Sequence, residues 1–133
     1  MDRFARDWAA SRLGRFVFEV RRALKSADAD SVHDLRVSIR RLSQCLRIFP
    51  EFFPAPETKR IRRRLRRIMK LAAEVRNRDI AVELLAKASL GSRSSLVARL
   101  AEDRKLGERA LAAELRRLAR RDFSSKWRAR LQL

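Results

Sequence analysis

Apolar residues recur every three to four positions through most of the chain, which is the spacing of one face of an α-helix. The first such segment spans residues 2–25 and predicts an amphipathic helix. Its apolar positions are Phe4, Trp8, Leu13, Phe16, Val17, Val20 and Leu24. The pattern stops at residues 27–30, and Ser31 with Asp34 three residues later resembles a capping box. We therefore expect a second helix from Ser31 to about Phe49.

The middle of the chain predicts a loop followed by a long basic helix. Three prolines at positions 50, 54 and 56 enforce the loop, which also carries three phenylalanines. These rings, which we expect to close one end of the core, are Phe49, Phe52 and Phe53. A third helix is predicted from about Glu57 to about Lys87. Its apolar stripe shifts at residues 76–79, which predicts a kink or a short break there.

The last third of the chain predicts one long and one short helix. Residues 89–95 are rich in serine and contain a glycine, which is the clearest turn signal in the sequence. A fourth helix follows and is expected to end near residues 121–122, after which Ser124 or Ser125 caps a short helix containing Trp127. Four main helices with short connections predict an all-α, four-helix-bundle-like fold, with residues 1–133 as one domain.

Charge adds the first indication of function. The 133 residues include 34 Lys and Arg against 16 Asp and Glu, a net charge of +18, and 28 of the cations are arginines. Such a charge repels itself and destabilises a compact state, so we expect a polyanionic partner. Arginine suits this role because its planar guanidinium binds phosphate oxygens in pairs. The cations lie within predicted helices, so a structured surface and not a flexible tail would bind the polyanion.

Several other classes of protein are disfavoured. Cys45 is the only cysteine and His33 the only histidine, so neither an internal disulfide nor a four-ligand zinc site can form. No segment has the roughly 20 apolar residues of a membrane span, and the N-terminus lacks an apolar signal core, so we expect a cytoplasmic protein. Because no paired carboxylates, phosphate-binding glycine loop or acidic cluster stands out, we expect no enzyme, no metal and no cofactor.

The second predicted helix carries the densest candidate site. His33, Arg36, Arg40 and Arg47 form a stripe directly beside its apolar stripe, where they would line a groove between helices. A solvated basic face is the alternative. Protonated His33 would strengthen anion binding, whereas a neutral His33 would only help to hold the helix start. Catalysis is disfavoured because neither the adjacent Asp34 nor Cys45 faces His33 on a helix.

The third predicted helix offers two sets of cations, and helix packing decides which one faces His33. Arg60, Arg64 and Arg67 lie immediately beside the apolar stripe. The set farther round the helix consists of Arg62, Arg63, Arg66 and Lys70. We expect the first set to face His33.

These residues resemble a known family. The run His33-x-x-Arg36-Val37-x-x-Arg40-Arg41-Leu42, the aromatic and proline loop, the basic third helix and Arg76-x-x-Asp79-Ile80 together resemble the CHAD domain, the conserved histidine α-helical domain. The resemblance implies a basic channel that binds inorganic polyphosphate without catalysis. It also implies that His33, Arg36, Arg40 and Arg41 are signature residues and that third-helix arginines form the facing wall.

Two features depart from the family pattern. Asn77 stands where the family usually has the first acidic residue of Arg-Asp-x-Asp, and the chain has one helical half where members usually have two. A homodimer would restore both halves, and a monomer with an open groove is the alternative. Association with polyphosphate granules would follow from polyphosphate binding. The other functions that we weigh are RNA or other nucleic-acid binding by the same basic surface and a regulatory role beside a polyphosphate- or triphosphate-processing enzyme.

Overall fold

The computed structural model describes residues 2–88 and 95–133, and every regular element in these ranges is helical. Four long helices are followed by a short C-terminal one, which confirms the predicted all-α fold. The elements in chain order are α1 (Asp2–Lys25), α2 (Ala29–Ile48), the 3-10 turn η1 (Pro50–Phe52), α3 (Ala55–Lys87), α4 (Ser95–Ala119) and α5 (Phe123–Arg130).

The start of α2 differs from the predicted capping box. Asp28, and not Ser31, is the N-cap, and its carboxylate accepts a hydrogen bond of 2.8 Å from the backbone N–H of Ser31. The Ser31 hydroxyl donates back to the carbonyls of Ser26 and Asp28, and Asp34 pairs with Arg22 of α1. The prediction missed this cap because Asp28, three residues before Ser31, is an equally good N-cap residue and starts the helix nearly one turn earlier.

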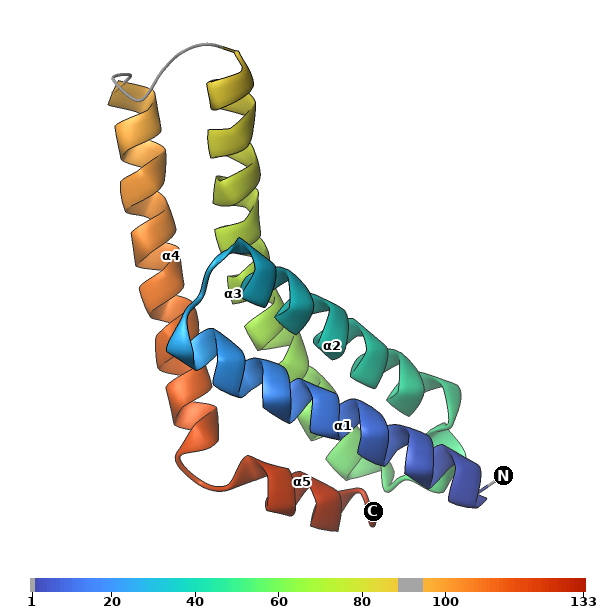
Figure 1. Cartoon of the computed structure of the whole chain (residues 1–133). Coiled ribbons are helices and arrows are strands. Elements are labelled where there is room, and N and C mark those ends of the chain that lie inside the picture. Colours follow the sequence, from blue (N-terminus) through green and yellow to red (C-terminus); the bar gives the residue numbers. More distant parts are fainter. Residues whose placement is uncertain (1, 89–94) are drawn as a thin grey trace.

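Two predicted features in the second half of the chain need correction. Residues 76–79 are helical, so α3 continues without the short break, and its axis changes direction along its length, which leaves the kink of the two predicted alternatives (Figure 1). Helix α4 ends at Ala119, and Asp122, with a left-handed φ of 46°, and not a serine, precedes α5. The predicted turn at 89–95 lies outside the described residues except for Ser95, which starts α4.

The helices form two antiparallel hairpins, α1 with α2 and α3 with α4, and α2 also packs along α3 (Figure 1). Helix α5 runs back beneath α1, where Trp127 stacks on Phe16 with ring centroids 5.7 Å apart. Near the N-terminal end of α1, Trp8 meets Phe49, and Phe53 is buried, so the predicted aromatic closure of the core is confirmed. None of the described helices is long and apolar enough to cross a membrane.

Candidate anion-binding site

Two facing helices carry a long stretch of uncompensated positive charge. Residues 35–48 of α2 and 58–73 of α3 contain no Asp or Glu, but they contain twelve Arg and Lys residues. The two helices pack against each other, so the cations on their facing sides lie along one seam. We call this the α2–α3 seam and define it by Arg36, Arg40 and Arg47 from α2 and Arg62, Arg66 and Arg76 from α3.

Arg36 lies at the centre of one end of the seam, the end nearer the start of α2, which we call the upper end. Its side chain is half-buried, and its Nε atom is enclosed without a hydrogen-bond partner among the described residues. Burial, and then the positive charges of Arg40 and Arg76, lower the pKa of Arg36. A partly buried guanidinium beside two others is unfavourable in the free protein. An anion at this point would supply the negative charge that neutralises these guanidinium groups and the hydrogen-bond acceptor for the Nε atom of Arg36.

Arg62 occupies a similar position at the lower end. Burial is the main cause that lowers its pKa, and the charges of Arg47 and Arg66 lower it further. Arg62 and Arg47 line a pocket of about 280 Å³ together with Lys59. The apolar floor of this pocket includes Leu46 and Pro50. Arg36 and Arg47 are eleven residues apart, so the two clusters lie about 16 Å apart along α2.

None of the six seam arginines forms an ion pair within residues 2–88 and 95–133. Exposed His33 lies one turn before Arg36 and extends the seam toward the start of α2. The structure therefore brings together the predicted stripe of His33, Arg36, Arg40 and Arg47. Arg41 is exposed about 100° farther round the helix than Arg40, so it extends the basic surface away from the seam.

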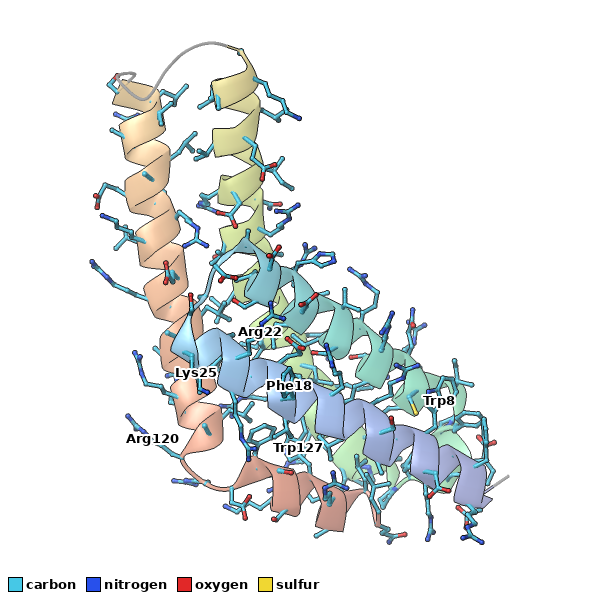
Figure 2. All side chains as sticks on the ribbon, viewed as in Figure 1. Trp8, Phe18, Arg22, Lys25, Arg120 and Trp127 are labelled. Carbon is cyan, nitrogen blue, oxygen red and sulfur yellow. The ribbon has the colours of Figure 1, made fainter. Side chains whose placement is uncertain are left out.

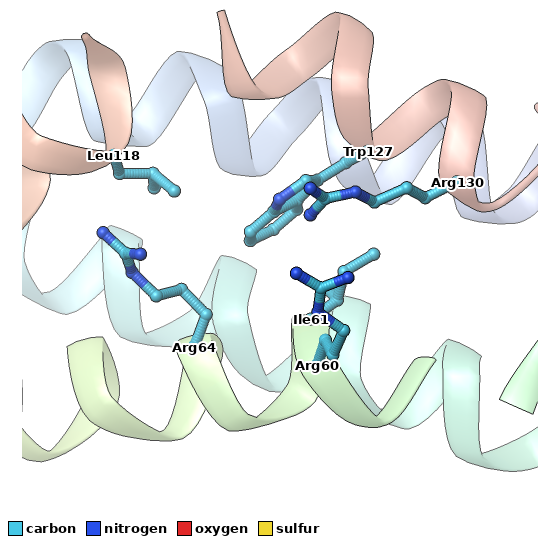
Figure 3. Close-up of a pocket in the computed structure, with 6 residues that line it drawn as sticks. All are labelled: Arg60, Ile61, Arg64, Leu118, Trp127 and Arg130. Atoms are coloured by element: carbon cyan, nitrogen blue, oxygen red, sulfur yellow. The ribbon is translucent and has the colours of Figure 1, made fainter. Parts of the chain in front are cut away.

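Arg60 and Arg64 lie on the opposite flank of α3, against α4 and α5. With Arg130 they surround Trp127 at a pocket of about 150 Å³ (Figure 3). Unlike the seam, this pocket has acidic partners. The Nε atom of Arg64 is 2.7 Å from buried Glu114, and Arg60 and Arg130 lie 3.9 and 3.6 Å from Glu57.

The arginines of α3 that meet the α2 stripe are thus Arg62 and Arg76, and not the predicted set of Arg60, Arg64 and Arg67. Exposed Arg67 follows Arg64 by three residues and belongs to the same flank as Arg60 and Arg64. The prediction placed Arg62 farther round the helix, but Arg60 and Arg62 lie equally far from Ile61, about 100° to either side, so both flanks border the apolar stripe. Packing of α4 and α5 against the Arg64 flank leaves the Arg62 flank to α2.

Arg104 was not predicted as a site residue, but it holds the upper end of the seam in place. Its guanidinium donates to Asp79 of α3 at 2.6 Å, to Glu108 at 2.7 Å and to the backbone carbonyl of Ala27 at 2.7 Å. Ala27 lies just before α2, and Asp79 lies three residues after Arg76. Asp79 is the acidic residue of the Arg76-x-x-Asp79 motif, and its place in that motif was the available signal for this ion pair.

The described residues offer few groups for catalysis. Cys45 is buried, and burial raises the pKa of its thiol, which disfavours the nucleophilic thiolate. No cluster of three metal-ligating side chains occurs in the part of the chain that the structure describes. The arrangement of the seam is suited to binding an anion of several charges along α2 and α3.

Comparison with known proteins agrees with this arrangement. The sequence model of the CHAD domain matches residues 8–133, which is nearly the whole chain. No curated protein and no solved structure matches the chain. The resemblance predicted from the motif around His33 is confirmed, and the chain belongs to the CHAD domain family.

Proposed function

We propose that the chain binds inorganic polyphosphate along the α2–α3 seam and does not catalyse a reaction on it. The observation that carries the proposal is the cluster of half-buried Arg36 and Arg76 with exposed Arg40, for which residues 2–88 and 95–133 supply no acidic partner. A polyphosphate chain carries closely spaced negative charges, so it can neutralise both ends of the seam at once. The CHAD family is associated with polyphosphate binding, which supports the choice of this anion.

The composition of the seam favours polyphosphate over RNA. Neither α2 nor α3 contains a Phe, Trp or Tyr residue. Proteins that bind single-stranded nucleic acid usually add exposed aromatic rings on which bases stack. The exposed rings Phe4 and Phe18 both belong to α1. The seam thus offers guanidinium groups for phosphates but no ring for a base.

The proposal also includes a homodimer. His33, Arg40 and Arg47 are exposed, so one chain covers only one side of a bound polyphosphate. A second chain would cover the other side and add a second set of arginines.

The test is a calorimetric titration of the protein with long-chain polyphosphate, single-stranded RNA and duplex DNA at one salt concentration near ~0.2 M, because affinity for a polyanion depends on salt. We expect polyphosphate to bind most tightly and its chain length to be unchanged after incubation. Tighter binding of RNA or DNA would overturn the choice of ligand. Shortened polyphosphate would overturn the non-catalytic role.

Paired variants separate the seam from general electrostatics. Arg36→Gln with Arg40→Gln removes two seam charges, whereas Arg120→Gln with Arg121→Gln removes two exposed charges at the end of α4, far from α2 (Figure 2). We expect the seam variant to lose at least tenfold more affinity for polyphosphate than the control. Equal losses would reduce the interaction to the net charge of the chain.

A further inference from the structure

The α3–α4 hairpin extends well beyond α1 and α2 (Figure 1). We call residues 76–88 of α3 and 95–110 of α4 the distal arm. No described residue of the arm is buried, although α3 is buried at intervals up to Val75 and α4 from Leu111 onward. The α3 part of the arm has 13 residues and is thus about 20 Å long. Two helices of this length without a core of their own need a further surface to bury their apolar side chains.

The apolar residues of the arm include a pair on one face of α3. Ile80 is 39% exposed and Leu84, one turn later, is 60% exposed. This face continues the flank on which Arg62 and Arg76 meet α2, but α2 begins too far down the molecule to cover it. The apolar pair is therefore continuous with the upper end of the α2–α3 seam.

Charge indicates what can cover this face. The described residues of the arm contain seven cations and five acids and thus carry only two of the chain's eighteen net positive charges. Another copy of this chain would be repelled strongly along the basic α2–α3 seam, whereas the nearly neutral arm offers little such repulsion. Glu83 and Lys87 are both exposed and lie one turn apart on α3, with Lys87 one turn after Leu84 and Glu83 about 100° round the helix from Leu84.

We propose that the distal arm is the surface through which two copies of the chain associate. The α3 helices pack antiparallel about a two-fold axis near Leu84, so that Ile80 and Leu84 of the two copies bury one another. Glu83 of each copy then lies within reach of Lys87 of the other. This inference rests on the proposed function and gives the homodimer its contact surface.

The consequence for the seam follows from the position of Arg76. It lies one turn before Ile80, so the association brings the upper ends of both seams to the same interface. A single polyphosphate chain could then run from the arginines of one copy to those of the other. The basic surface along which the polyphosphate lies would then be about twice as long in the dimer as in one copy of the protein.

The first measurement is the molar mass by light scattering of the protein without polyphosphate, over a range of protein concentrations, near ~0.5 M salt, where exposed charges are largely screened. We expect a concentration-dependent dimer. A monomer at every concentration would overturn the proposal, and it would leave polyphosphate binding by the seam standing. A dimer that does not prefer polyphosphate would overturn only the proposed function.

Two variants locate the contact. Leu84→Glu should yield a monomer whose circular dichroism is unchanged. Ile48→Glu is the matched control, because Ile48 is 57% exposed but lies at the opposite end of α2 from the arm, and it should remain dimeric. Dimers of equal stability in both variants would overturn the proposal.

A charge exchange keeps the test valid if Leu84→Glu does not fold. Glu83→Lys alone should weaken the dimer at least fivefold, because each copy then presents two cations to the other. Adding Lys87→Glu should restore most of the loss. Failure of the second change to restore the dimer would overturn the antiparallel contact.

Discussion

Replacing Arg36 by Met should stabilise the free protein and weaken polyphosphate binding in the same variant. Arg36 is repelled by Arg40, four residues later on α2, and by Arg76 of α3, and its Nε atom has no acceptor among the described residues. A like-charge pair at this helical spacing costs about 0.2–0.5 kcal/mol. With a similar cost for the charge of Arg76 across the seam, the two neighbours together destabilise the free protein by about 0.5–1 kcal/mol. Met keeps the length and the apolar contacts of the side chain but removes the charge.

The assay is a pair of thermal melts and polyphosphate titrations on the same samples. A gain of 0.5–1 kcal/mol corresponds to a rise in Tm of about 2–4 °C for a chain of this size. Losing one charge-assisted hydrogen bond to a phosphate costs about 1.5–3 kcal/mol, a tenfold to hundredfold loss of affinity. The slope of log affinity against log salt should fall by nearly one unit, as expected for one lost phosphate contact. Polyphosphate should therefore raise the Tm of the variant less than that of the parent.

Arg120→Met is the control, because exposed Arg120 lies at the end of α4 away from the seam (Figure 2). Its Tm should move by no more than the equivalent of about 0.5 kcal/mol, as for most surface substitutions. A lower Tm for Arg36→Met would refute the reasoning, because it would show that Arg36 stabilises the free protein. An affinity no lower than that of Arg120→Met would show that Arg36 does not contact the ligand.

Two further substitutions test how the site is held. Arg104→Ala leaves Asp79 partly buried without its partner and leaves the carbonyl of Ala27 without its donor. Urea melts should therefore show that the free energy of unfolding falls by about 2–3 kcal/mol, against at most about 0.5 kcal/mol for the control Lys105→Ala. Equal losses in the two variants would contradict a positioning role for Arg104. The hydrogen bond from the Ser31 N–H lowers the pKa of Asp28 in the folded chain, so its stabilising effect is present above the ordinary value of about 3.9 and is lost as pH falls below it. Asp28→Asn should therefore leave stability near pH 7 almost unchanged and flatten its decline in urea melts between pH 4 and 2, and parallel declines would contradict the cap.

Most of the fold could be predicted from the sequence because the residues within each helix carry the apolar spacing that predicts it. Apolar spacing identified the four long helices, and the core positions Leu35, Ile39 and Leu42 are all buried. The stripe from His33 to Arg47 could also be predicted, since residues on one helix keep a fixed angular relation. Predictions failed where two nearby residues could each cap a helix. At the start of α2 the N-cap is Asp28, whereas Ser31 was expected.

The sequence by itself determined which helices form, which faces are apolar and that the chain carries far more positive than negative charge. Only the tertiary structure decided which arginines of α3 face α2. Arg62 and Arg64 lie on opposite borders of one apolar stripe, and their local patterns are equivalent. Glu114, fifty residues away in the sequence, neutralises Arg64, whereas the charges that act on Arg62 are the positive ones of Arg47 and Arg66. The physical reason is that the neutralisation of a charge depends on its distance in space from an opposite charge. Helix packing sets this distance, and the periodicity of the sequence does not determine it.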